Sequence, residues 1–136
     1  MLDRDFNIKL IDFGLAESVW ARDHEKRKEI LTTGTTGFIA PEQLYNDGSG
    51  KFCLMKCDIF ALGVFLFILL RGTNPFIEPN KDDPYYQYII SKRYNQFWKS
   101  HQTWREGDMI SREVKALICD MISFNPDERP DVHSIR

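Results

Sequence analysis

Residues 58–72 read DIFALGVFLFILLRG, and the twelve residues 59–70 in the middle of this stretch are all apolar. A membrane-spanning helix needs about 20 such residues, so this run is too short to cross a bilayer. A short helix that is apolar on every side is normally buried on every side. We therefore expect residues 59–70 to form a helix at the centre of a core, with Asp58 as its N-cap and its end at Arg71-Gly72.

More helices are expected on the C-terminal side of this segment. Asp83 is a predicted N-cap for a helix that begins at Pro84 and continues to about Lys92. Its apolar face would carry Tyr85, Tyr88 and Ile89. Residues 95–110 show no clear period and are expected to be irregular, with their aromatic side chains packed in the core.

A second amphipathic pattern follows near the C-terminus. Ser111 is a predicted N-cap, and apolar residues then recur with helical spacing at Val114, Leu117, Ile118, Met121 and Ile122. This helix is expected to end at Asn125-Pro126, and a final helix is expected to begin near Pro130.

The part of the chain before residue 58 has weaker patterns. Residues 7–11 read as a short strand, residues 34–38 as an ordered turn, and Pro41 as the first residue of a short helix. The charged run 21–29, ARDHEKRKE, is expected to be a solvated loop. The whole chain is therefore predicted to be mainly α-helical.

Composition excludes several classes of function. The formal net charge is −2, which gives no electrostatic reason to expect nucleic acid or anionic lipid as a main partner. The N-terminal residues MLDRDF do not form a signal peptide. The odd number of cysteines (Cys53, Cys57, Cys119) argues against a disulfide framework, so we expect reduced thiols and an intracellular, cytoplasmic protein.

Several short motifs follow one another along the chain. Asp12-Phe13-Gly14 comes directly after the predicted strand, and Ala40-Pro41-Glu42 begins 28 residues after Asp12. Asp58, the apolar helix, GTNPF (72–76) and NPDERP (125–130) come next. In this order and register, the series resembles the C-terminal lobe of eukaryotic protein kinases. GTTGFIAPE (34–42) is most similar to Ser/Thr kinases of the calcium/calmodulin-dependent type, although Thr36 replaces their usual proline.

The resemblance implies a fold and a chemistry. The fold would be the helical C-terminal lobe of a kinase-like α+β domain spanning residues 1–136, with an activation segment at 12–42. Asp12 would bind the Mg²⁺ that accompanies ATP, since a hard cation prefers carboxylate oxygen. Phe13 would pack to set the active or inactive state, and Gly14 would permit the backbone turn. Taken alone, the same three residues could simply form a surface turn.

The resemblance also implies roles for three threonines. Thr35 would lie beside the hydroxyl group of a Ser or Thr substrate, and the alternative is an ordinary turn threonine. Thr32 and Thr33 are candidate sites of activating phosphorylation. The family's usual position falls nearest Leu31, which cannot be phosphorylated, so this role stays open.

Three charged residues would have mainly structural roles. Glu42 and Arg129 resemble a buried ion pair that ties the end of the activation segment to the loop before the last helix. Alternatively, Glu42 and Arg129 could simply be two surface charges. Asp58 resembles an aspartate that accepts backbone hydrogen bonds from the catalytic loop, and this role is compatible with an N-cap.

Parts of the kinase pattern are missing from the 136 residues. The His-Arg-Asp catalytic loop, the Gly-rich loop, and the strand lysine with its partner glutamate do not occur. We therefore expect Met1 to be an internal methionine or a misplaced start, and the isolated chain to be inactive. We also expect one side of helix 59–70 to be exposed and to be covered by the missing N-lobe of the same gene or by a partner.

Two functions remain open at this stage. The chain is a part of a Ser/Thr protein kinase that transfers the γ-phosphoryl group of ATP to protein substrates, or it is a non-catalytic kinase-like binding module. The retained Asp-Phe-Gly motif favours the kinase, and the missing catalytic loop favours the binding module.

Overall fold

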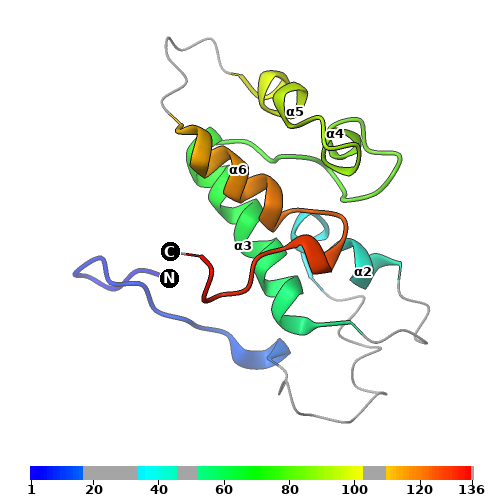
Figure 1. Ribbon diagram of the computed structural model, residues 1–136. Helices are drawn as coiled ribbons and strands as arrows, with labels where there is room; N and C mark the ends of the chain where they lie inside the picture. Colours follow the sequence, from blue (N-terminus) through cyan, green and yellow to red (C-terminus); the bar gives the residue numbers. More distant parts are fainter. Residues whose placement is uncertain (17–33, 46–51, 103–109, 136) are drawn as a thin grey trace.

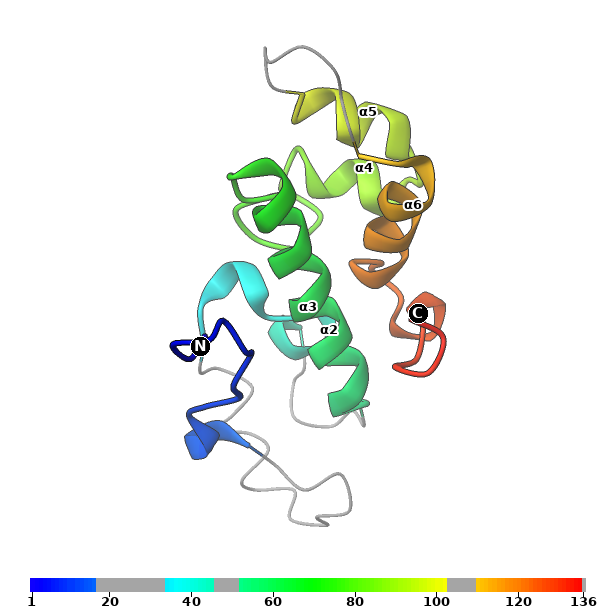
Figure 2. The ribbon, with the colours of Figure 1, turned by 90° about the vertical axis from the view of Figure 1, so that its left-hand side faces the viewer.

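The computed structural model describes residues 1–16, 34–45, 52–102 and 110–135, and these residues surround one long helix (Figure 1). The elements in chain order are η1 (Phe13–Leu15), η2 (Thr36–Phe38), α2 (Pro41–Leu44), α3 (Leu54–Arg71), α4 (Tyr86–Ile90), α5 (Tyr94–Ser100), α6 (Arg112–Met121) and η3 (Pro126–Glu128). Helix α6 lies along α3, while α4 and α5 lie near one end of it (Figures 1 and 2). The described ranges contain helices and no strand, which confirms the mainly α-helical prediction.

The central helix begins earlier than the sequence suggested. Its N-cap is Cys53, whose carbonyl accepts the backbone N–H groups of Lys56 and Cys57 at 3.0 and 3.2 Å. The prediction that Asp58 caps this helix is therefore wrong, since Asp58 lies inside the helix. The predicted end is confirmed, because Gly72 has a left-handed φ of 71° and its N–H donates to Ile68 O at 2.7 Å.

Close packing of α3 against α6 depends on Gly63. A Cβ atom at this position would lie 2.8 Å from both Ile122 Cγ2 and Met121 Cβ, closer than carbon atoms can approach. On α6, the hydroxyl of Ser111 accepts the N–H of Val114 at 3.3 Å, as expected for its N-cap. The helix ends at Met121, before the predicted Asn125.

Aromatic side chains from three segments, α3, α5 and the loop that carries Phe76, fill the core beside this contact. The ring of Phe67 on α3 lies 5.4 Å from that of Phe97 and 5.2 Å from that of Trp98, both on α5. Phe60 contacts Phe76 at 6.0 Å between ring centroids. These rings are buried together with Val64 of α3, Ile89 of α4, Ile118 of α6 and Ile122 directly after α6.

Asp83 organises the turn into α4. Its Oδ1 accepts the N–H groups of Tyr85 and Tyr86 at 2.9 and 2.8 Å, and its Oδ2 accepts that of Ile77 at 2.9 Å. The prediction that Asp83 is the N-cap of a helix beginning at Pro84 is wrong, because α4 begins at Tyr86 with Tyr85 as its N-cap. The helix is also shorter than expected, and its buried face differs. Tyr86 is fully buried and its hydroxyl donates to Ile122 O at 3.0 Å, whereas Tyr85 is 40% exposed. Burial raises the pKa of Tyr86.

Three other sequence predictions are wrong. Residues 95–110 are not wholly irregular, since α5 forms where Phe97 and Trp98 pack on α3, a tertiary contact without a local signal. No helix begins at Pro130, and the following residues form a turn held by the carboxylate of Asp131. Residues 7–11 form no strand, because their pairing in the described ranges is a single bridge between Leu2 and Ile8.

A buried arginine joins three of these segments. Arg129 Nη1 and Nη2 donate to Glu42 Oε1 and Oε2 at 2.6 and 2.7 Å, so the ion pair is bidentate. Nη1 also donates to Lys56 O at 2.9 Å, and Nε donates to Ser123 O at 2.9 Å. The guanidinium carbon lies 5.0 Å from the ring centroid of Phe60. The arginine side chain is fully buried, and every nitrogen of its guanidinium group donates a hydrogen bond.

Replacing Glu42 by glutamine should lower the free energy of unfolding by about 3–5 kcal/mol, because the charge of Arg129 would remain buried without its counter-charge. The measurement is urea denaturation of residues 1–136 followed by circular dichroism. Lys92→Gln is the matched control, since it breaks an exposed ion pair to Glu128 of 2.9 Å and should barely move the midpoint. Equal, small shifts for both variants would contradict a structural role of the buried pair.

Candidate functional site

Three of the residues predicted for the site lie around one hollow. Asp12, Thr35 and Asp58 line a cavity of about 490 Å³, together with residues of η2 and of the first turns of α3. The three are far apart in the sequence and come from the N-terminal segment, the turn 34–38 and the central helix. The fold therefore brings together a carboxylate, a hydroxyl and a second carboxylate.

Asp12 has an unusual backbone conformation. Its φ of 61° and ψ of 71° lie in the left-handed region, and it precedes η1. Such conformations are uncommon for residues other than glycine and often occur at functional sites. A Cβ atom at position 14 would lie 3.4 Å from Asp12 Oδ1, so Gly14 leaves space beside the carboxylate. Phe13 is 68% exposed, and its expected packing role stays a prediction.

Thr35 lies directly before η2. Its carbonyl accepts the N–H of Phe38 at 2.8 Å, which holds the turn, and the residue is exposed. The hydroxyl makes no capping hydrogen bond to the turn. Thr32 and Thr33 lie outside the described residues, so their role as phosphorylation sites stays a prediction.

Asp58 and Cys57 connect the hollow to the buried ion pair. Asp58 is exposed on α3, and partial desolvation raises its pKa. Cys57 also lines the hollow, and its thiol donates to Glu42 Oε1 at 3.4 Å. Burial, followed by the nearby Glu42 carboxylate, raises the pKa of Cys57. Sequence reasoning assigned no role to Cys57 beyond a small buried hydrophobe, because its contact with Glu42 is created by the tertiary fold.

The donor set limits the metals that the site could hold. Among the described residues, no group of three or more His, Cys, Asp or Glu side chains is placed to hold a metal ion. A site made only of protein ligands is therefore not formed there. Mg²⁺ commonly keeps several waters and binds through one or two carboxylates and substrate phosphates. The exposed carboxylate of Asp12 at the hollow fits one position in such a ligand set.

One face of α3 is apolar and exposed. Met55, Leu62, Phe65 and Leu69 are 53%, 41%, 48% and 64% exposed, and their spacing places them on the same side of the helix. The prediction that helix 59–70 is buried on every side is therefore wrong, whereas the expectation of one uncovered side agrees with the structure. This face starts at the hollow, which Met55 also lines. None of the helices in the described ranges is long and apolar enough to cross a membrane.

Phe65 and Phe67 lie on the same helix and differ in burial, at 48% and 0% exposed. Phe65→Gln should leave the urea midpoint of residues 1–136 nearly unchanged and reduce binding of the hydrophobic dye ANS. Phe67→Gln should lower the free energy of unfolding by at least about 3 kcal/mol, because it removes a core ring and buries an amide. Similar destabilisation by the two substitutions would contradict an open face at Phe65.

Comparison with known proteins shows the family to which this sequence belongs. A family model described as a protein kinase domain matches residues 1–136. A probable cell cycle serine/threonine-protein kinase of Encephalitozoon cuniculi is 35% identical over 134 residues, which cover 98% of this chain and 25% of that protein. Calcium-dependent protein kinase 5 of Plasmodium berghei is 37% identical over 132 residues, which cover 96% of this chain and 20% of that protein.

The relatives also include CBL-interacting serine/threonine-protein kinase 10 of Arabidopsis thaliana, which is 30% identical over 138 residues. The chain spans a quarter or less of the length of these relatives, at 25%, 20% and 25%. The resemblance to Ser/Thr kinases that the motifs indicated is confirmed, and a calcium-dependent kinase is among the similar proteins. This chain belongs to the protein kinase family.

Proposed function

We propose that this chain supplies the metal-facing and substrate-facing residues of a Ser/Thr protein kinase, which transfers the γ-phosphoryl group of ATP to hydroxyl groups of protein substrates. The observation that supports this best is the hollow shared by Asp12, Thr35 and Asp58. These are the positions to which the motif series assigns metal binding, substrate contact and support of the catalytic loop. Their convergence in space is what a common site requires.

In this proposal Asp12 supplies one oxygen ligand to the Mg²⁺ that accompanies ATP. Bound Mg²⁺ neutralises charge on the phosphate oxygens during transfer. Asp12 is exposed and lines the hollow, so its carboxylate is accessible to a hydrated cation. Thr35, which also lines the hollow, would present its hydroxyl to a substrate Ser or Thr.

In this proposal the ion pair between Glu42 and Arg129 helps to position the turn that carries Thr35. Residues 12–42 would form the activation segment, and Glu42 at its end is held by Arg129 at 2.6 and 2.7 Å. A fixed end restricts the positions available to the turn 34–38 and therefore to Thr35. Phosphorylation of Thr32 or Thr33 would act on the same segment by ordering it through new charge-assisted hydrogen bonds.

We also propose that residues 1–136 alone do not catalyse phosphoryl transfer. The catalytic aspartate and the ATP-binding lysine of the family pattern do not occur among them, and transfer depends on all these groups together. The exposed face of α3, which starts at the hollow, supports a further part of the enzyme at this place. The N-lobe and catalytic loop of the same gene, or a partner protein, would cover it.

The same exposed face supports a second candidate, a non-catalytic kinase-like module that binds a partner through α3. This candidate gives no role to the exposed Asp12 carboxylate. The two functions therefore differ in the consequence of removing that carboxylate.

When residues 1–136 are joined to a kinase N-lobe and catalytic loop, Asp12→Ala should lower the rate of peptide phosphorylation at least about 100-fold, because an electrostatic contact to the transferring group is lost. The assay measures transfer of labelled phosphate from ATP to a Ser-containing peptide. Asp5→Ala is the control, since it removes another exposed acid of the same segment outside the hollow. A rate unaffected by Asp12→Ala would reject the kinase proposal and favour the binding module.

A further inference from the structure

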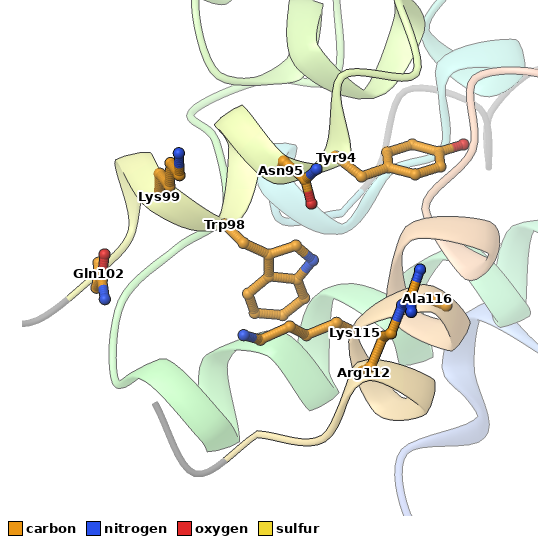
Figure 3. A pocket seen from close by; sticks show the side chains of 8 residues that line it. All are labelled: Tyr94, Asn95, Trp98, Lys99, Gln102, Arg112, Lys115 and Ala116. Atoms are coloured by element: carbon orange, nitrogen blue, oxygen red, sulfur yellow. The ribbon is translucent and has the colours of Figure 1, made fainter. Parts of the chain in front are cut away.

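We propose that the groove between α5 and α6 is a docking site for an acidic segment of a partner protein. The groove has a volume of about 470 Å³ and is lined by side chains from both helices (Figure 3). It shares no lining residue with the hollow at Asp12. The inference therefore does not depend on phosphoryl transfer.

The charge of the groove indicates the chemistry of its partner. Lys99 comes from α5, Arg112 and Lys115 come from α6, and no aspartate or glutamate is among the described residues that line the groove. The whole chain has a net charge of −2, so this concentration of positive charge is local. A surface with one sign of charge attracts and orients a partner of the opposite sign.

A rigid indole forms the floor of the groove. Trp98 is 6% exposed, and its Nε1 donates to Cys119 Sγ at 3.3 Å, which fixes the ring. In Figure 3 Trp98 points from α5 toward α6, and the Lys115 side chain lies beside its ring. The Lys115 ammonium group is 5.7 Å from the ring centroid, within the range of a cation–π interaction. The floor is therefore ordered before a partner binds, which reduces the entropic cost of binding.

The remaining polar groups favour a peptide. Asn95 on α5 and Gln102, two residues after the end of this helix, are exposed and line the groove, and a carboxamide can both donate to and accept from a peptide backbone. Nucleic acids are normally bound by a broad basic face on a protein of positive net charge. The overall charge here is −2, and the cations lie in one groove between two helices, so an acidic polypeptide fits better.

The test measures binding of a fluorescein-labelled, glutamate-rich peptide to residues 1–136 by fluorescence anisotropy, with a glutamine version of the peptide as the uncharged control. Arg112→Glu should weaken binding about tenfold, because an attractive charge becomes a repulsive one. Arg112 is the first residue of α6, where an acidic side chain favours the helix, so this variant should keep its fold. Lys99→Glu provides a second reversal on α5 with the same expected direction.

Lys81→Glu is the matched control, because it changes the net charge equally at an exposed residue outside the groove. The proposal expects glutamate-rich peptide to bind, high salt to weaken the complex, and Lys81→Glu to leave it unchanged. It is overturned if the glutamine peptide binds equally well, if neither peptide binds, or if Lys81→Glu weakens binding as much as Arg112→Glu. Tighter binding of a single-stranded oligonucleotide at the same residues would also overturn it.

Discussion

The burial of one guanidinium group constrains much of this structure. Arg129 is fully buried, so its charge and its N–H groups must be satisfied inside the protein. Glu42 supplies the counter-charge, while the carbonyls of Lys56 and Ser123 accept the remaining described hydrogen bonds. These partners come from α2, from the first turn of α3 and from the segment after α6. A single side chain thus links these three segments.

The ion pair between Arg129 and Glu42 is connected to the candidate site through neighbouring residues. Glu42 follows the turn that carries Thr35, and it also accepts a hydrogen bond from Cys57, which lines the hollow beside Asp58. The buried ion pair therefore contacts a residue that lines the hollow, and the exposed apolar face of α3 reaches the hollow at Met55. A hollow that borders an exposed apolar face is consistent with the proposal that a second body covers this part of the lobe.

The sequence predicted the elements that carry local signals. The N-cap Ser111, the turn held by Asp83 and the helix end at Gly72 follow from local chemistry. Helix α5 and the early start of α3 do not, because they depend on packing between distant residues. The motif series singled out Asp12, Thr35 and Asp58 as candidate site residues, but it gave no indication of a role for Cys57 or of the groove beside Trp98. Both exist only because segments far apart in the chain lie together.

The most direct test of this account is isothermal titration of residues 1–136 with ATP in the presence of Mg²⁺. We propose that Asp12 belongs to a site that also needs groups outside these residues, because one exposed carboxylate holds a hydrated cation weakly. The expected result is no saturable binding at millimolar ATP. Saturable, Mg²⁺-dependent binding that Asp12→Ala removes would contradict this claim and show that the site is complete within the chain.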